Sequence, residues 1–245
     1  MKLFSKFKQS FRALSRFEWG LWIVSVCVVT LSFLLGDTSK PLTLVASLIG
    51  VTSLILIAKG DVLGQVLTCI FSILYAIVSF ELRYYGEMIT YLGMTFPSAA
   101  AAIVAWLRHP FEAAKKEGKN EVEVAPLTTR YKVELILGTV LATMLFHFIL
   151  RALGNASLFL STISVSTSFM ASYLLIRRNS GYALAYAAND IILIALWIIA
   201  SMENLINLPM VFCFLMFLFN DFYAFINWRR IQNRQQRFQF DEERK

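Results

Sequence analysis

Residues 182–201 read YALAYAANDIILIALWIIAS, and residues 208–228 read LPMVFCFLMFLFNDFYAFINW. Each run has about the ~20 residues that an α-helix needs to cross the hydrocarbon core of a bilayer. Each also carries an Asn-Asp pair, Asn189-Asp190 in the first and Asn220-Asp221 in the second. A carboxyl group inside a bilayer is costly and is usually functional. The two runs therefore predict an integral membrane protein whose activity depends on polar groups within its helices.

The rest of the chain has the same apolar character. Of its 245 residues 58% are hydrophobic and 16% charged, and the mean hydropathy is +0.62. Little sequence lies outside the apolar runs, so no sizeable soluble domain is expected. The cysteines lie within the runs at no metal-ligand spacing, so we predict no metal site, disulfide or cofactor. The basic residues flank the spans and form no striped patch, which argues against nucleic acid as a partner.

Eight candidate spans fit the chain, at 18–35, 41–58, 62–80, 85–107, 133–150, 158–176, 182–201 and 208–228. Spans two to four and spans six to eight have matching features. Trp106 and Trp228 end the two triplets, and basic or polar breaks follow the first helix of each, at 59–61 and 177–179. Such matches are typical of the internal repeats of transporters.

We therefore predict an all-α integral membrane fold with two parallel three-helix repeats, a linker helix between them and one extra N-terminal helix. The predicted divisions are 1–36 for a basic segment and the extra helix, 41–108 for the first bundle, 109–131 for a cytoplasmic loop, 132–151 for the linker helix, 157–228 for the second bundle and 229–245 for a basic cytoplasmic tail.

The distribution of basic residues predicts the orientation. In this scheme all of the 23 Lys and Arg residues except Lys40, Arg83 and Arg151 lie on the side of the N-terminus. Positively charged loops stay in the cytoplasm, so both termini are expected to be cytoplasmic.

The last two spans hold the strongest candidates for a binding site. Tyr186, Asn189 and Asp190 are three and four residues apart and share one helical face, which Trp197 extends. In the next span Asn220 and Tyr223 are neighbours on the helix surface. Asp221 lies near the basic Arg229-Arg230, and its side chain is expected to snorkel toward them. A polar seam between helices is the alternative interpretation of these groups.

Spans three and four add a second set of polar side chains. In span three Gln65 and Thr68 begin a stripe of polar groups, and in span four Tyr91, Thr95 and Ser98 share one face. Pro97 is expected to break or kink that helix near a cavity. The full set of predicted substrate-binding residues is Gln65, Thr68, Tyr91, Thr95, Ser98, Tyr186, Asn189, Asp190, Trp197, Asn220 and Tyr223.

Three short motifs resemble the PnuC group of bacterial vitamin transporters, whose best-known members take up nicotinamide riboside. They are YALAYAAND at 182–190, NDFY at 220–223 followed by NWR at 227–229, and YYGEMITY at 84–91. The resemblance implies a three-plus-one-plus-three bundle related to the SWEET sugar transporters, facilitated diffusion, and trapping of the substrate by a cytoplasmic kinase. The resemblance aligns two asparagines of the family with Asn189 and Asn220. A tryptophan of the family falls near Ala185, so Tyr186 is expected to supply the aromatic ring in its place.

The expected function is uptake of nicotinamide riboside, or a similar vitamin, across a bacterial plasma membrane, with the lipid bilayer as the protein's surroundings. A thiamine or deoxynucleoside transporter on the same scaffold, a proton-coupled carrier and a non-transport scaffold protein stay open, as does a homo-oligomer. The isolated His109 and His147 argue against an enzyme, and the chain has no Walker-type loop for ATP.

Overall fold

The computed structural model describes residues 9–35, 41–81, 85–116, 121–155, 157–203 and 208–243. Within these residues eight helices are long and apolar enough to cross a membrane, which confirms the predicted all-α fold and the number of spans. Apart from one isolated bridge between Pro110 and Val122, the described residues form no β-structure. The elements in chain order are α2 (Arg16–Leu35), α3 (Pro41–Ala58), α4 (Val62–Glu81), α5 (Tyr85–Thr90), the π-helix η1 (Tyr91–Thr95), α6 (Phe96–Arg108), α7 (Glu112–Lys116), α8 (Thr129–Ala152), α9 (Leu158–Ile176), α10 (Tyr182–Glu203) and α11 (Leu208–Glu243).

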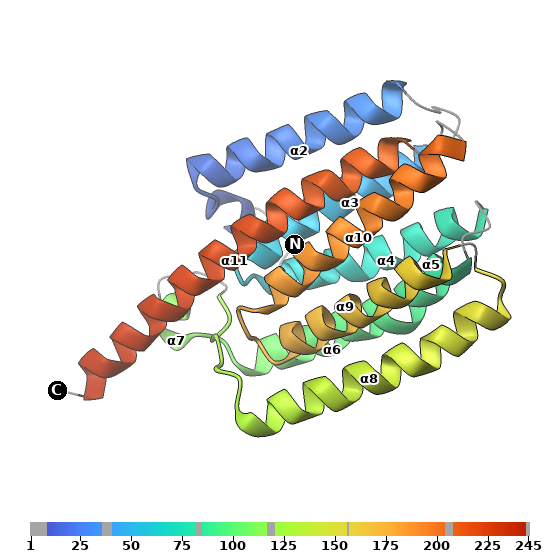
Figure 1. Ribbon diagram of the computed structural model, residues 1–245. Coiled ribbons are helices and arrows are strands. Elements are labelled where there is room, and N and C mark those ends of the chain that lie inside the picture. Colours follow the sequence, from blue (N-terminus) through green and yellow to red (C-terminus); the bar gives the residue numbers. More distant parts are fainter. Residues whose placement is uncertain are drawn as a thin grey trace.

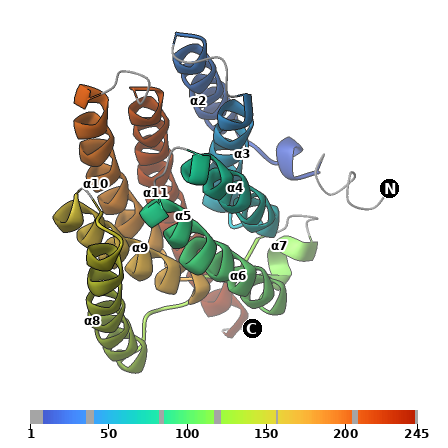
Figure 2. The ribbon, with the colours of Figure 1, turned by 90° about the vertical axis from the view of Figure 1, so that its right-hand side faces the viewer.

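The spans form two triplets with α8 between them in the chain (Figures 1 and 2). The first triplet is α3, α4 and the α5–η1–α6 span, and the second is α9, α10 and α11. Successive spans alternate in direction, so α3 and α9 run the same way and the triplets are parallel. The extra helix α2 packs against α3 and α11, while α8 packs against α9. Only 11% of the apolar window of α8 is buried, so this helix mainly faces lipid.

The last helix is longer than its apolar run. α11 continues as far as Glu243, beyond the predicted end of the span at Trp228. The residues after Trp228 are mostly Arg, Gln and Asn with no Pro or Gly, so nothing in the sequence ends the helix where the hydropathy falls. We call the end of the bundle from which this extension projects the tail end (Figure 1).

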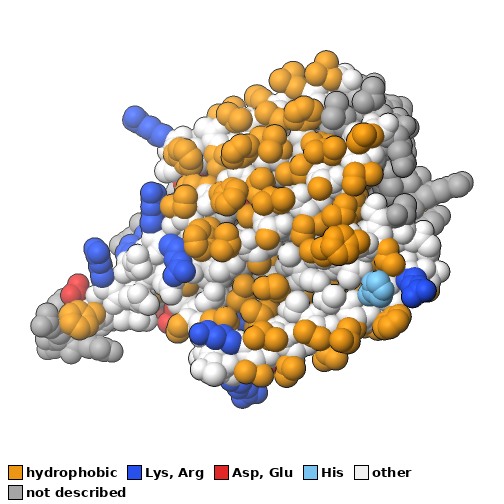
Figure 3. All heavy atoms as spheres, viewed as in Figure 1, with side chains coloured by type: hydrophobic (Ala, Val, Ile, Leu, Met, Phe, Trp, Pro, Cys, Tyr) orange, Lys and Arg blue, Asp and Glu red, His pale blue; other side chains and the backbone are white. Residues whose placement is uncertain are grey.

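Apolar side chains cover the face of the bundle seen in Figure 3, and most of the Lys and Arg visible on it lie toward the tail end. This surface is typical of helices surrounded by lipid, in which charged residues gather beyond the hydrocarbon.

The turns that follow the first helix of each triplet have the same conformation. Gly60 has φ of 72° and Arg178 has φ of 57°, both in the left-handed region. In each turn the side chain of the next residue accepts a hydrogen bond from the backbone N–H two residues further on. Asp61 Oδ1 accepts from the backbone N–H of Leu63 at 3.0 Å, and Asn179 Oδ1 accepts from that of Gly181 at 3.0 Å. The two turns predicted as repeat equivalents are therefore built alike, down to the hydrogen bonds.

Two buried tryptophans join the triplets reciprocally at the tail end. Trp106 Nε1, at the end of the first triplet, donates to the backbone carbonyl of Leu175 in the second at 3.2 Å. Trp228 Nε1, in the second triplet, donates to the carbonyl of Ile57 in the first at 2.9 Å. Their ring centroids lie 5.4 Å apart. The predicted repeat is thus visible as a pair of crossed hydrogen bonds.

The loop before α8 forms hydrogen bonds with both turns at the tail end. Val122 N donates to Gly60 O at 3.1 Å, and Ala125 N donates to Arg178 O at 3.0 Å. From the extension of α11, Gln235 binds this loop at Val122 O and Val124 N, at 3.0 and 2.8 Å. The segment 121–125, which we call the strap, therefore ties both triplets and α11 together.

Candidate binding cavity

A cavity lies between the two triplets, within the span of the bundle. Residues from all six spans of the triplets line it, and neither α2 nor α8 is among them. Its lining combines aromatic rings with hydroxyl, amide and carboxyl groups, as small-molecule sites do. The polar side chains of the lining are Ser53, Gln65, Thr68, Glu87, Thr90, Tyr91, Thr95, Ser164, Ser168, Tyr186, Asn189, Asp190 and Asp221.

Most of the residues predicted from the sequence line this cavity. They come from three elements, α4, η1 and the face of α10 that the helical spacing indicated. These residues are Gln65, Thr68, Tyr91, Thr95, Tyr186, Asn189 and Asp190. The structure therefore brings together candidates that are more than a hundred residues apart in the chain.

The amide of Asn189 is held in place by α9. Its Oδ1 accepts hydrogen bonds from Ser164 Oγ at 3.0 Å and Thr167 Oγ1 at 2.9 Å. These bonds use the oxygen and fix the orientation of the amide, so the Nδ2 group is the part left to donate to a ligand. The Tyr186 hydroxyl lies 3.2 Å from Ser172 Oγ, again on α9. The small hydroxyl residues of α9 thus position the polar face of α10.

Gln65 is the most unusual group in the lining. Its side chain is fully buried, and neither Nε2 nor Oε1 has a hydrogen-bond partner among the described residues. A buried polar group without a partner costs about 1–3 kcal/mol, so such groups are rare and call for an explanation. In a cavity between two repeats, the explanation that fits is a ligand that pairs with this amide.

An aromatic wall forms where α4 meets η1. Tyr91 packs against Phe71, with ring centroids 5.6 Å apart and nearly perpendicular, and against Tyr75 at 4.3 Å. The irregularity expected near Pro97 is the π-helical turn Tyr91–Thr95, directly before α6, in which Pro97 is the second residue. A π-turn inside a helix often marks a functional site, because it changes which side chains face inward. Here Tyr91 and Thr95 both face the cavity.

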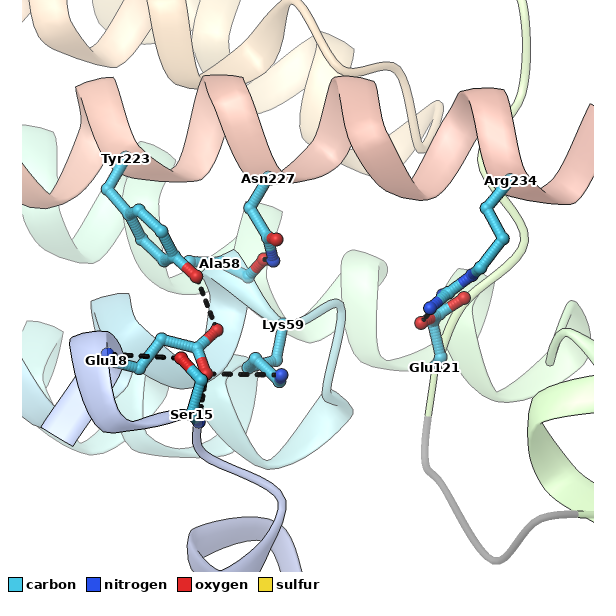
Figure 4. A network of polar contacts seen from close by, with 8 residues as sticks. All are labelled: Ser15, Glu18, Ala58, Lys59, Glu121, Tyr223, Asn227 and Arg234. Carbon is cyan, nitrogen blue, oxygen red and sulfur yellow. Dashed lines mark hydrogen bonds and ion pairs between the residues drawn. The ribbon is translucent and has the colours of Figure 1, made fainter.

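The other predicted residues do not line the cavity. Ser98 donates to the carbonyl of Met94 in the preceding η1 at 2.6 Å, and Trp197 is buried in the apolar core. Asn220 and Tyr223 face α2 instead. Asn220 Nδ2 donates to Ser25 Oγ at 3.0 Å, and the Tyr223 hydroxyl donates to Glu18 Oε1 at 2.5 Å (Figure 4).

Asp221 lies where Asn220 was expected. Its carboxyl group lines the cavity beside that of Asp190, and it forms no ion pair with Arg229 or Arg230. Sequence reasoning also missed Ser164 and Ser168, although their spacing of four residues in the serine-rich α9 places them on one face. Among the described residues no group of His, Cys, Asp and Glu is placed to hold a metal ion.

Comparison with known proteins agrees with this architecture. The family described as "Nicotinamide mononucleotide transporter" matches residues 40–230. A protein of Neisseria mucosa named "Nicotinamide riboside transporter PnuC" is 28% identical over 93% of this chain and 86% of the relative. A protein of Haemophilus influenzae with the same name is 23% identical over 96% of this chain and 99% of the relative.

A solved structure, "Crystal structure of the Vitamin B3 transporter PnuC", superposes with a TM-score of 0.80 at 26% identity, covering 94% of this chain and 97% of that one. The resemblance predicted from the motifs of α10, α11 and α5 is confirmed. The match of the family over 40–230, both triplets included, shows that this chain belongs to the nicotinamide mononucleotide transporter family.

Proposed function

We propose that this protein carries nicotinamide riboside across a bacterial plasma membrane, through the cavity between its two triplets. The observation that carries this proposal is the composition of the lining. Aromatic rings, the unpaired amide of Gln65, the amide of Asn189 and carboxyl groups face one cavity. A pyridinium ring can stack on Tyr91 or Tyr186, and its carboxamide can pair with Gln65 or Asn189.

The substrate in the family's name, nicotinamide mononucleotide, differs by one phosphate group from the substrate in the relatives' name, nicotinamide riboside. The residues that line the cavity favour the riboside. Glu87, Asp190 and Asp221 line the cavity, and no Lys, Arg or His is among the described residues of the lining. A phosphate monoester carries about −1.5 to −2 charge and is usually bound by cationic side chains or helix N-termini. Next to three carboxyl groups it would meet repulsion, so the riboside is the better substrate.

Thiamine is the second candidate because of the same carboxyl groups. It also combines an aromatic ring with a permanent positive charge, and the three acidic side chains suit either vitamin. A deoxynucleoside carries no such charge and is disfavoured.

We further propose that the tail end faces the cytoplasm and that transport is by facilitated diffusion. Arg108, Arg177, Arg178 and Arg229 all lie at or near this end, as the positive-inside rule requires. In this scheme a cytoplasmic kinase retains the substrate by phosphorylating it, since the product no longer suits the acidic cavity.

A thermal-shift and calorimetric screen of the purified protein tests the substrate. Nicotinamide riboside at a hundredfold excess over its Kd is expected to add about 2.7 kcal/mol to the free energy of unfolding. Nicotinamide mononucleotide and a neutral deoxynucleoside are expected to give no shift in the melting temperature. Thiamine is included to test the second candidate substrate. The absence of any shift with millimolar nicotinamide riboside refutes the proposal.

Uptake into proteoliposomes tests the transport mode. Facilitated diffusion predicts that labelled nicotinamide riboside equilibrates across the vesicle membrane and accumulates only when a kinase and ATP are enclosed. Accumulation without the kinase that an uncoupler abolishes would show instead that transport is proton-coupled.

A further inference from the structure

Two carboxyl groups meet at the cavity from neighbouring helices of the second triplet. Asp190 on α10 and Asp221 on α11 are each 3% exposed, and their side chains lie close enough to interact with each other. Both line the cavity. In the described part of the chain neither forms an ion pair with a Lys, Arg or His side chain.

The neighbouring groups indicate that a ligand completes this arrangement. The fully buried Gln65, which lines the same cavity, has no hydrogen-bond partner for either amide atom among the described residues. A carboxyl pair that served only to join α10 to α11 would not require an unpaired amide in the same cavity.

The electrostatics of the cavity favour a positive ligand. Two adjacent carboxyl groups shielded from water repel each other when both are ionised, so such a pair tends to retain one proton and one negative charge. The other titratable side chains of the lining are Glu87, Tyr91 and Tyr186, which supply no positive charge. A single cationic ring would supply it.

We propose that Asp190 and Asp221 together select for a permanent positive charge on the ring of the substrate, and admit a cationic nucleoside in preference to a neutral one of the same shape. The inference rests on the proposed function and adds the residues that decide specificity. It also accounts for the carboxyl group of Asp221, which points to the cavity while its neighbour Asn220 faces α2.

A matched pair of ligands isolates the effect of charge. Nicotinamide riboside carries a pyridinium ring, whereas its 1,4-dihydro form has the same ribose and carboxamide on a neutral ring. Calorimetric titration of the wild-type protein with each ligand is expected to show at least tenfold tighter binding of the cation. Equal affinity for the two ligands overturns the inference, whatever the variants do.

The double variant Asp190→Asn/Asp221→Asn keeps the size of both side chains and removes the charge of the pair. It is expected to reduce the ratio of the two affinities to about one, mainly by weakening the binding of the cation, whereas either single variant leaves one carboxylate and should keep most of the preference. Asp241→Asn is the matched control, because Asp241 is exposed on the extension of α11 and lies outside the cavity. It should keep the wild-type ratio.

The outcomes separate the inference from the proposed function. If the wild-type protein binds neither form of the nucleoside, the proposed substrate is wrong. If it binds the cation more tightly but the double variant keeps the full preference while remaining folded by thermal unfolding, the substrate stands and the role of the carboxyl pair is refuted. A parallel loss of both affinities in the double variant would assign the pair to structure and would also refute the role.

Discussion

Replacing Tyr223 with Phe removes one hydroxyl group from the contact between α2 and the bundle. That hydroxyl donates to Glu18 Oε1 at 2.5 Å, and the Glu18 side chain is only 1% exposed (Figure 4). Glu18 Oε2 also accepts from Ser15 N at 2.5 Å and lies 3.3 Å from Lys59 Nζ. The substitution therefore leaves a buried carboxyl group with one partner fewer. The ring of Tyr223 packs against Phe17 at 5.2 Å, a contact that Phe retains.

A hydrogen bond to a charged group is worth about 1.5–3 kcal/mol. For a chain of this size 1 kcal/mol lowers the melting temperature by roughly 2–4 °C, so Tyr223→Phe is expected to lower it by roughly 3–12 °C. Thermal unfolding of the purified protein in detergent measures this. Since Tyr223 does not line the cavity, the affinity for nicotinamide riboside should stay within about twofold of the wild type.

Tyr131→Phe is the control for this measurement. It removes the same atom from a tyrosine whose hydroxyl makes no hydrogen bond to another described residue, and it keeps the ring under the Arg177 guanidinium, 3.9 Å from its centroid. Its melting temperature should match that of the wild type. An unchanged melting temperature in Tyr223→Phe, combined with weaker binding of nicotinamide riboside, would refute the reasoning and return Tyr223 to the binding site.

Four further substitutions test other parts of the structure. Gln65→Leu removes two unpaired buried polar atoms, so the melting temperature should stay the same or rise while the affinity for nicotinamide riboside falls at least tenfold; lower stability would show that the amide is paired within the protein. Trp106→Phe and Trp228→Phe each remove one hydrogen bond to a carbonyl that keeps a backbone partner, at Leu175 and Ile57, and should lower the free energy of unfolding by similar amounts, about 0.5–1.5 kcal/mol, in denaturant titrations; a large difference between them would contradict their equivalence. Gln235→Leu should raise hydrogen exchange in the strap, measured by mass spectrometry, with unchanged ligand affinity; unaltered exchange would mean that other contacts hold this segment.

The sequence predicted the helices well because membrane spans must satisfy every backbone group internally and are therefore apolar over a fixed length. The predicted bounds 41–58 and 158–176 are those of α3 and α9. The end of α11 was predicted too early. Hydropathy falls at the edge of the membrane, whereas the helix continues for another fifteen residues, to Glu243, on the propensity of its polar residues.

The candidate site could be predicted where the helical period alone places the residues on one face of a helix. Tyr186, Asn189 and Asp190 follow the helical period and all line the cavity. For α11 the period could not decide between Asn220 and Asp221, because adjacent residues point about 100° apart and either direction could face the centre. The deciding fact is tertiary, since α2 covers the face that carries Asn220. No pattern in the sequence states where an extra helix docks.

The crossed tryptophan bonds have a consequence for how this end of the molecule can open. Each bond runs from the third helix of one triplet to the first helix of the other, and the two rings touch. Moving the triplets apart at the tail end therefore breaks both bonds and the ring contact together. A rearrangement that separates the triplets at this end must therefore break contacts of both repeats in one movement, and the strap, which binds the turns of both triplets, opposes the same movement.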